Sequence, residues 1–554
     1  METASSHTKS IGRISRNWLT AIVSIVSFGI VVSRRPDAII HPQFFAEGGQ
    51  VFYADAWNDG LKVLFRARGG YLHTLERLVG AIAVHFPLAW GPSIFVLVAA
   101  IIQIAPIWYL LSRRLDSVIP SLPVRILLCL IYVALPNSYG ESMNLINADW
   151  HLAIVSFILL YADAPKGRFG WIRDLTVIAI GGLTGPFAVL IWPLAVWRWW
   201  RDRSSWRLTI LVSETVFGII QGLTILLTLS SNKAIGAHLG ATWNLLARII
   251  AGQVIVGSLI GMNQYTHIYN SHIWIHTLIP DAITLAAGIL LLWAFIKGPD
   301  VLKGLILFAV ITMAASLRDP LLSTTTPQWL VMLMPGAGTY YYMFPMLAWI
   351  ATLIWYVSRS VPAILPLDTT LPDTAQPSSP EEHRLSTGNN AVLPDSPNII
   401  DSKSRITPNR HNAVLSDSSD ATNRGKSNIG NGATVVDKPM LKLSGWRLVA
   451  SIIGVVMLLS LFLLGIPGDW SYPPYLPLSW NAAAAKVEHA KPGTRVTIPI
   501  NPQGWTMTLD AHGTKPALPH RKSRTSGTGS TGNSGGTGKT VRTSGTDKTT
   551  RSNQ

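Results

Sequence analysis

Most residues with the chemistry for a reaction lie in one stretch, residues 41–77, the first polar segment. Its acids include Glu47 and Asp55. If residues 50–59 are helical after the paired glycines, these two acids lie about two helical turns apart on one face. A carboxylate at a cavity beside a membrane takes the proton from an attacking hydroxyl group. The alternative is a solvated loop with ordinary surface acids.

Arginines of the first polar segment have the chemistry to hold a phosphate. Arg66, Arg68 and Arg77 each carry a planar guanidinium group, which forms two parallel hydrogen bonds with one phosphate. We expect this segment on the outer side of the membrane, where Lys and Arg are normally scarce. A lipid-linked phosphate would account for these bases. Contact with anionic lipid headgroups is the alternative.

A second polar segment, residues 137–151, combines carboxylates with carboxamides. These groups suit sugar hydroxyls, and as hard oxygen ligands they also suit a divalent cation. Helix capping is the alternative, because Asn147 or Asp149 could cap a helix that begins near Trp150. The candidate residues of this segment are Glu141, Asn144, Asn147, Asp149 and His151.

Other polar or unusual residues give weaker signals. His267, His272 and His276 have a spacing of i, i+5, i+9, which is not a recognised metal-binding pattern. The single cysteine, Cys129, lies in an apolar run and excludes an intramolecular disulfide. No glycine-rich loop typical of nucleotide binding is present.

The composition predicts an all-α polytopic membrane protein. Of the 554 residues, 48% are hydrophobic and only 13% are charged, and long apolar runs recur. The net charge of +16 gathers in expected cytoplasmic loops and in a tail. Because no basic groove interleaved with aromatic residues is present, we do not expect a nucleic-acid partner.

Hydropathy and charge predict about eleven transmembrane helices, with an inside start and an outside end. Residues 1–33 are interpreted as an uncleaved anchor. Within residues 78–111 a break is expected near Pro87 and Gly91, and residues 181–186 are expected to form a turn between two short helices. Residues 242–261 are either a span or an interfacial helix.

The predicted organisation has one large membrane domain followed by a linker, a last span and a tail. The linker and the tail are expected to be disordered because they are rich in small and polar residues. The expected parts are a membrane domain, 1–358, with outer loops 34–76, 137–151, 230–275 and 317–338; a cytoplasmic linker, 359–443; a final transmembrane helix, 444–466; a short outer segment, 467–512, with strand-like alternation; and a basic Gly/Ser/Thr tail, 513–554.

Five stretches of this chain resemble parts of one family of bacterial multi-spanning proteins. In that family the first outer loop has an aromatic-Ala-Glu-Asp motif, then a phenylalanine-rich helix and a Gly-Tyr-Leu-His segment. These proteins are similar to GT-C-type glycosyltransferases. The matching stretches are HPQFFAEGGQVFYADAWNDGLKVLFRARGGYLHTLERLV (41–79), ESMNLINADWHLAI (141–154), GLTGPFAVLIWPL (182–194), GAGTYYYMFPMLAW (336–349) and PINPQGWTMTL (499–509).

The resemblance implies a GT-C-like fold in the bacterial inner, cytoplasmic membrane and transfer of a sugar from a polyprenyl-phosphate donor on the outer face. The acceptor would be an envelope glycan or a lipid, and a divalent cation is a possible cofactor. Glu47 matches the family's glutamate, the expected base. Tyr71 and His73 match the Gly-Tyr-Leu-His segment, which implies a role in substrate binding.

Two positions depart from the family pattern. Gly48 stands where the family has an aspartate, and Asp55 is the residue that could supply the missing acid. Tyr341 stands where the family often has an arginine, which weakens a phosphate role at that position. These departures leave a catalytically inactive assembly protein as one alternative.

The other alternative is a transporter or flippase for a lipid-linked glycan. It predicts ionisable residues inside spans, near the membrane midplane. Glu214 and Gln221, within residues 206–229, are the clearest candidates. Most acids instead lie in the expected outer loops, which favours chemistry at the membrane surface.

Overall fold

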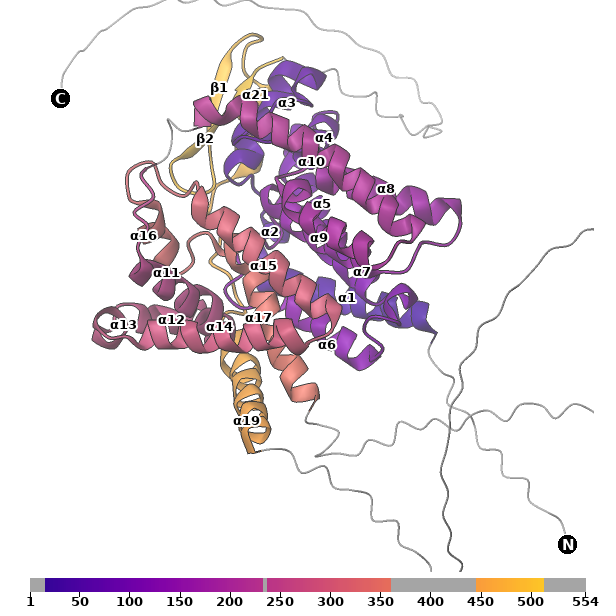
Figure 1. Ribbon diagram of the computed structural model, residues 1–554. Coiled ribbons are helices and arrows are strands. Elements are labelled where there is room, and N and C mark those ends of the chain that lie inside the picture. Colours follow the sequence, from indigo (N-terminus) through magenta and orange to yellow (C-terminus); the bar gives the residue numbers. More distant parts are fainter. Residues whose placement is uncertain (1–14, 233–236, 360–444, 513–554) are drawn as a thin grey trace, which may run out of the picture. The chain divides into compact units, whose positions relative to one another are not determined.

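The computed structural model describes residues 15–232, 237–359 and 445–512 (Figure 1). The predicted disordered linker, 359–443, and basic tail, 513–554, lie outside the described residues, apart from the linker's first residue. The described chain is mostly helical and divides into two compact units. Unit 1 comprises Met1–Cys129, Gly140–Ile235 and Ser471–Gln554, and unit 2 comprises Leu130–Tyr139 and Gly236–Trp470.

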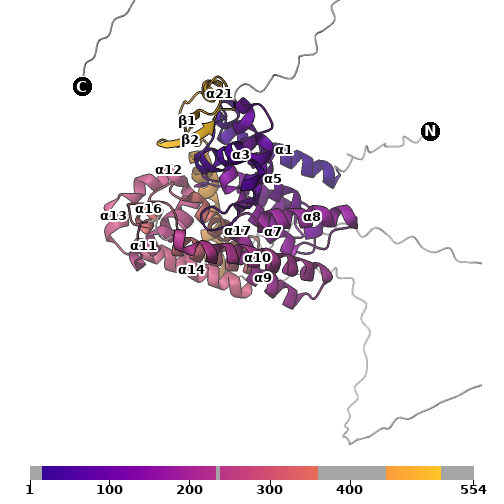
Figure 2. The same ribbon diagram turned by 90° about the horizontal axis from the view of Figure 1, so that it is seen from above.

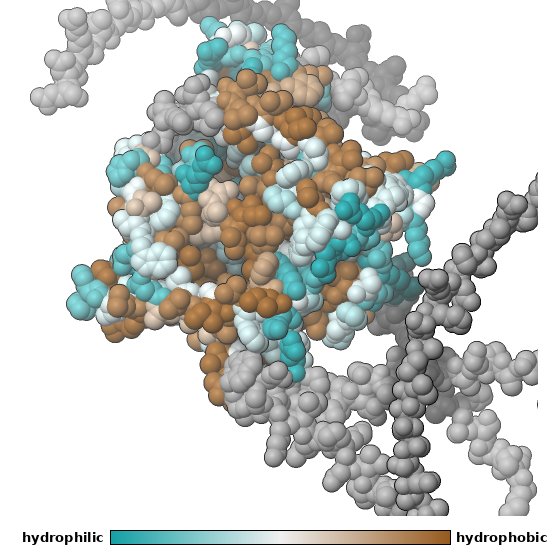
Figure 3. Space-filling view, in the orientation of Figure 1, coloured by the Kyte–Doolittle hydropathy of each residue, from teal (hydrophilic) through white to brown (hydrophobic). Residues whose placement is uncertain are grey.

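Eight helices of the described chain are long and apolar enough to cross a membrane. Each has at least 18 residues. At a rise of 1.5 Å per residue, a helix of this length is close to the hydrocarbon thickness of a bilayer. Many large apolar side chains on these helices are exposed, and broad hydrophobic areas cover the visible face in Figure 3. These features define a mostly helical multi-pass membrane protein, and the count of eleven spans stays a prediction. The eight are Arg16–Arg34, Leu88–Leu110, Ser205–Thr228, Trp243–Tyr269, Ile279–Lys297, Asp300–Arg318, Thr339–Ser358 and Ser451–Gly468.

Unit 1 contains the first polar segment, most of the second, and the ordered C-terminal residues. Its core joins aromatic and aliphatic side chains from both ends of the chain, such as Phe44, Phe95 and Trp480. Its helices and strands are α1 (Arg16–Arg34), α2 (Asp37–Ile40), η1 (Gly48–Tyr53), α3 (Ala54–Asp59), η2 (Gly60–Val63), α4 (Thr74–Ala83), η3 (Leu88–Trp90), α5 (Gly91–Leu110), η4 (Arg113–Leu115), η5 (Leu145–Asn147), α7 (Ala148–Tyr161), α8 (Gly167–Gly182), α9 (Phe187–Arg201), α10 (Ser205–Asn232), α21 (Trp480–Glu488), β1 (Arg495–Ile500) and β2 (Trp505–Asp510). Helix α6 (Leu122–Val133) runs from unit 1 into unit 2.

All the secondary-structure elements described in unit 2 are helices. Its helices are α11 (Trp243–Ile249), η6 (Ile250–Val256), α12 (Gly257–Tyr269), α13 (His272–His276), α14 (Ile279–Lys297), α15 (Asp300–Arg318), α16 (Gln328–Leu333), η7 (Thr339–Tyr342), α17 (Met343–Ser358), α19 (Gly445–Ser460), η8 (Leu461–Gly465) and α20 (Ile466–Gly468). Gly261, at φ 83°, kinks α12, and the Asp469 carboxylate accepts hydrogen bonds from the backbone N–H groups just beyond the kink, at Met262 and Asn263. A side chain at 261 would meet that carboxylate.

Several local predictions are confirmed. The expected break near Pro87 and Gly91 falls between α4 and α5, and the expected turn at 181–186 separates α8 from α9. The strand-like alternation near the C-terminus forms the antiparallel pair β1–β2, in which Arg495 lies opposite Asp510. Between the two alternatives for residues 242–261, the structure favours a span, because the helical run Trp243–Tyr269 is 27 residues long.

The C-terminal elements α21, β1 and β2 pack against the first polar segment within unit 1. Figures 1 and 2 both place them beside α3. Alternate residues of β1, namely Val496, Ile498 and Ile500, turn inward and join the core that contains Phe44. About 450 residues of sequence therefore separate two parts of one site region, as in the bond from Asn58 to the Thr508 carbonyl.

Candidate functional site

The first polar segment enters its helix through a strained residue and a π-helical turn. Ala46 has φ 42°, a value that non-glycine residues rarely adopt, and Glu47 is the N-cap of η1. The expectation that the helix follows the glycine pair is wrong, because the helix begins at Gly48 itself. Since residues in a π-helix turn by smaller angles, spacing along an α-helix does not place Glu47 and Asp55 on one face. Strain and π-helical turns both occur often at functional sites.

The Glu47 carboxylate is half-buried and binds no other side chain of the described residues. Among the described residues it has no hydrogen-bond donor and no ion-pair partner. A carboxylate in this condition is free to accept a proton from a ligand, because no guanidinium or backbone N–H competes for its oxygens. Of the two acids predicted to act as the base, Glu47 alone has this freedom.

Asp55 is held by two arginines. Its Oδ2 lies 2.7 Å from a nitrogen of Arg77 and 3.5 Å from a nitrogen of Arg66. The Arg77 side chain is only 1% exposed and lies over the Phe52 ring. Because both arginines contact the same carboxylate oxygen, Asp55 is better suited to hold the segment together than to act as a catalytic base.

The predicted phosphate-binding arginines differ in whether their guanidinium groups are already paired with an acid. Arg66 contacts Asp59 at 2.9 Å, and this hydrogen bond, with a smaller contribution from Asp55, raises the pKa of Arg66. Arg68 is exposed, and its guanidinium group has no acid partner within the described chain. Arg68 is therefore the arginine of this segment with all its side-chain donors available to an anion.

Tyr71 and His73 lie at the end of the first polar segment, where their rings pack together at 4.7 Å. His73 is buried, and its Nδ1 lies 3.7 Å from Oε1 of Glu76. Glu76 is fully buried, and neither of its carboxylate oxygens accepts a hydrogen bond within the described residues. Asp149 is also buried, and burial, with a smaller contribution from Glu76, raises the pKa of Asp149. The structure thus adds an internal acidic group beside the predicted residues.

Three of the five family-like stretches meet at this point. The Thr184 hydroxyl accepts a hydrogen bond from the backbone of Leu75, and the Gly185 N–H donates to the Leu72 carbonyl. A Cβ atom at Gly185 would lie 2.5 Å from Oδ2 of Asp149, so this close approach requires glycine. Gln221, predicted as a midplane residue of a transporter, instead forms two hydrogen bonds with the Leu72 backbone. The stretches therefore build a rigid junction that fixes the end of the first polar segment.

In the second polar segment, most of the polar side chains form hydrogen bonds with the backbone of the same segment. Asn144 and Asn147 both donate to the Gly140 carbonyl, and the Asn144 side chain also caps η5 by accepting from Ile146. The His151 ring contacts the Glu141 carbonyl at 3.1 Å. Of the two residues expected to cap the helix near Trp150, Asn147 occupies the N-cap position of α7 without a side-chain cap, whereas Asp149 accepts a hydrogen bond from the Trp150 N–H.

A divalent cation has few ligands available. Within the described residues, no group of three or more His, Cys, Asp or Glu side chains could hold a metal ion. The carboxamide oxygen of Asn144 is already used as a cap. Binding of a divalent cation therefore stays a prediction, and the described residues offer no set of ligands for it.

The C-terminal segment is joined to the approach to Glu47 by a set of hydrogen bonds. Asn501 donates to the Gln43 side chain at 2.5 Å, and its carbonyl accepts from Ala46 at 2.6 Å. Further along, the Trp57 indole donates to the Asp510 carbonyl. These bonds fix the backbone on both sides of Glu47.

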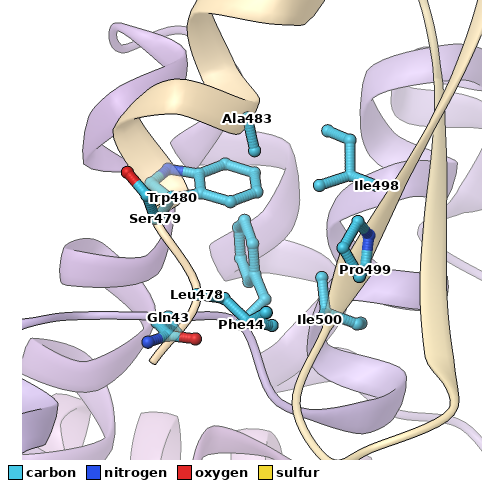
Figure 4. Close-up of a pocket in the computed structure, with 9 residues that line it drawn as sticks. All are labelled: Gln43, Phe44, Leu478, Ser479, Trp480, Ala483, Ile498, Pro499 and Ile500. Atoms are coloured by element: carbon cyan, nitrogen blue, oxygen red, sulfur yellow. The ribbon is translucent and has the colours of Figure 1, made fainter. Parts of the chain in front are cut away.

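A pocket of about 80 Å³ lies where these two segments meet (Figure 4). The rings of Phe44 and Trp480 meet edge to face in it, with centroids 4.9 Å apart, and Pro499 of β1 closes the opposite side. Its remaining lining is Gln43, Leu478, Ser479, Ala483, Ile498 and Ile500. A smaller apolar pocket of about 20 Å³ adjoins the same segment and is lined in part by Phe45 and Gly48.

Two buried polar residues of unit 1 were not singled out from the sequence. Tyr53 is buried, and burial, together with the nearby Glu488 charge, raises the pKa of Tyr53. Its phenol therefore keeps its proton near neutral pH and does not act as a base. Arg35 is only 4% exposed and has no acid partner in the described residues; it contacts the Ser142 carbonyl and the Tyr475 hydroxyl. A pair of arginines directly after an apolar helix, Arg34 and Arg35, was the available signal for a buried cation.

Gly48, the main departure from the family pattern, is buried against apolar side chains. A Cβ atom there would make ordinary contacts with Ile146 and Phe95 at 3.6–3.7 Å. An aspartate at 48 would therefore direct its carboxylate toward an apolar surface. Tyr341, the second departure, belongs to η7 of unit 2.

No protein-family model matches this chain, and no curated protein matches its sequence. The class that the structure defines is a helical multi-pass membrane protein. The resemblance to GT-C-type glycosyltransferases stays a prediction.

Proposed function

We propose that this chain is an integral membrane glycosyltransferase of the bacterial inner membrane. It moves a sugar from a polyprenyl-phosphate donor to an envelope glycan or lipid acceptor on the outer face. The observation that supports this proposal most is the carboxylate of Glu47, which is half-buried, follows a strained residue and has no partner in the described chain. Such a group is suited to general-base catalysis at a membrane surface.

In the proposed reaction, Glu47 takes the proton of the acceptor hydroxyl as its oxygen attacks the anomeric carbon. The bond between that carbon and the donor's phosphate oxygen breaks, and the lipid phosphate leaves with the electron pair. Holding both substrates at one membrane edge supplies proximity. A cation near the leaving phosphate stabilises its developing charge.

Arg68 is the first-segment arginine that best fits this last role. Its guanidinium group is exposed and has no acid partner in the described residues, whereas Arg66 contacts Asp59 at 2.9 Å. Asp55 acts as a positioning residue in this scheme, because it pairs with the buried Arg77. Tyr71 and His73 would border the same end of the segment.

A transporter of a lipid-linked glycan is the second candidate. Glu214 of α10 is 1% exposed, and its Oε2 has no hydrogen-bond partner within the described residues. An ionisable side chain within a span is unusual and is often functional. The other predicted midplane residue, Gln221, forms two hydrogen bonds with the Leu72 backbone. Its side chain is therefore already bonded, which reduces the support for this alternative.

The experiment that tests the proposal is a mass profile of cell-envelope glycans and glycolipids. Wild type, a deletion, and the deletion carrying Glu47→Gln are compared, with Asp59→Asn as the control because this exposed acid of the same segment pairs with Arg66. We expect one glycan to lose a defined sugar mass in the deletion. Asp59→Asn restores that mass and Glu47→Gln does not.

Two outcomes contradict the proposal. Accumulation of a complete, unprocessed lipid-linked glycan in the deletion supports the transporter, and Glu214→Gln then reproduces it. Full restoration by Glu47→Gln supports the inactive assembly protein, for which Gly48 is the sequence argument. Equal amounts of each variant in the membrane fraction are confirmed by immunoblot.

A further inference from the structure

Two histidines of unit 2 form an exposed pair on one short helix. His272 and His276 are the first and last residues of α13, four positions apart, so their side chains lie on the same face. Their ring centroids are 4.7 Å apart and the rings are tilted by 41°. The spacing of the three histidines in this region concealed the pair, because only a helical turn brings positions i and i+4 together.

The short helix is fixed firmly enough to hold this geometry. The Ser271 hydroxyl caps it by accepting a hydrogen bond from the Trp274 N–H. The Trp274 ring, between the two histidines in sequence, is buried against Tyr265 at 5.7 Å between ring centroids. With Trp274 as the inward anchor, both imidazoles remain on the exposed side.

We propose that His272 and His276 together bind a transition-metal ion such as Zn²⁺, Ni²⁺ or Cu²⁺. Imidazole nitrogen is a preferred ligand of these ions, whereas Mg²⁺ and Ca²⁺ prefer oxygen. Two nitrogens, each about 2.0–2.1 Å from a tetrahedral ion, are about 3.3 Å apart. Rings with centroids 4.7 Å apart reach this separation with small side-chain rotations.

The remaining coordination positions go to water or to an external ligand. No group of three or more His, Cys, Asp or Glu side chains in the described residues could surround a metal ion, so the protein supplies two ligands. A site with open positions resembles catalytic or exchangeable metal sites more than closed structural ones. The ion is therefore able to bind a further anionic or nitrogen-containing group.

No basic side chain lies close to the pair along the sequence. Between Arg248 and Lys297 the chain has no Lys or Arg. Neither His272 nor His276 makes a hydrogen bond or an ion pair within the described chain, so both ring nitrogens are available. These observations do not depend on the proposed transfer reaction, and the site is independent of Glu47.

The test is a titration of the purified full-length protein in detergent, without an affinity tag, with Ni²⁺ or Zn²⁺ by calorimetry. We expect binding by the wild-type protein, and a decrease in affinity of about tenfold or more in His272→Ala and in His276→Ala, because each loses the second, already-positioned ligand. His267→Ala is the matched control, since His267 is also exposed and belongs to the preceding helix α12. It retains wild-type affinity.

A second variant separates pairing from the mere number of histidines. Exchanging the residues at 276 and 277 (His276→Thr with Thr277→His) keeps every imidazole but moves one from the helix to its C-cap, where the backbone is extended at φ −119° and ψ 169°. We expect it to bind as weakly as His276→Ala. Wild-type affinity in this exchange variant, or in both single alanine variants, would overturn the proposal.

The pH dependence gives a third readout. Because a metal-bound imidazole must be neutral, binding by the wild-type protein is weaker at pH 5 than at pH 7.5. Binding that is unchanged between these pH values would mean that carboxylates or detergent hold the ion, and would also overturn the proposal. Circular dichroism of each variant confirms that the helical content is retained.

Discussion

The first and second polar segments both contain acids and other polar residues but use these side chains differently. In the second segment, Asn144 and Asn147 donate to one carbonyl, and the His151 ring contacts another. In the first segment, Asp55 is paired with buried Arg77, while Glu47 is left without a partner in the described chain. The second segment uses its Asn and His side chains to bind its own backbone. The first segment has a carboxylate, Glu47, and an arginine, Arg68, that are available to a ligand.

This difference shows that a cluster of polar residues in a sequence does not by itself identify a reactive site. Backbone donors and acceptors that helices leave unpaired take up nearby polar side chains first. Only a group that remains after this pairing is available to a ligand. We therefore propose that the first segment carries the chemistry and that the second serves structural bonding, and both proposals can be tested.

The largest expected effect on stability comes from the buried charge pair of the first segment. Arg77→Ala leaves Asp55 without its closest cation and removes the contact with Phe52, so we expect a loss of about 3 kcal/mol or more in the free energy of unfolding. Arg66→Ala, at a more exposed position, is expected to lose less than about 1 kcal/mol. Denaturant unfolding in detergent measures both, and equal losses would contradict the assigned roles.

A smaller effect is expected at the paired glycines that begin the π-helical turn. A Cβ atom at Gly49 would lie 2.7 Å from Cβ of Phe44, whereas at Gly48 the nearest neighbour, Ile146, is 3.6 Å away. Gly49→Ala should therefore decrease stability by about 1–3 kcal/mol through overpacking. Gly48→Ala should be nearly neutral in the same unfolding measurement. If Gly48→Ala is the more harmful change, the close packing around Glu47 is described wrongly.

The smallest effect is expected in the second segment. Asn144→Ala removes the cap of η5 and one bond to the Gly140 carbonyl, so we expect a decrease of about 0.5–2 kcal/mol in stability. Asn144→Ser, which keeps a capping oxygen, should recover part of this loss. Thermal unfolding distinguishes the two variants. A stability unchanged by Asn144→Ala would reopen a ligand-binding role for this residue.

The sequence predicted the features that depend on local pattern. Apolar runs, proline and glycine breaks, and the alternation in residues 495–500 gave the helical membrane class, the turns between helices and the hairpin. It did not reveal the pairing of Asp55 with Arg77, since this pairing depends on how α3 packs against α4. Spacing along an α-helix also failed to describe residues 48–53, because their π-helical geometry depends on packing that the pattern does not encode.

Long-range contacts were the main feature that the sequence could not supply. Nothing in the pattern joins Gln43 to Asn501, although these side chains share a hydrogen bond of 2.5 Å. The similarity of the C-terminal stretch to the family was a signal that it matters, but it did not indicate where the stretch binds. Likewise, the His272–His276 pair became visible only when residues 272–276 were seen to form a helix.

The most direct test of the central claim compares one residue from each polar segment in the same deletion strain. The measured quantity is the sugar mass restored to the envelope glycan, per amount of protein in the membrane, by Glu47→Gln and by Asn147→Ala. We expect Glu47→Gln to lose about 10²–10⁴-fold in transfer rate, the usual contribution of a general base, whereas Asn147→Ala restores the glycan. Restoration by Glu47→Gln together with failure of Asn147→Ala would place the chemistry in the second segment and contradict this account.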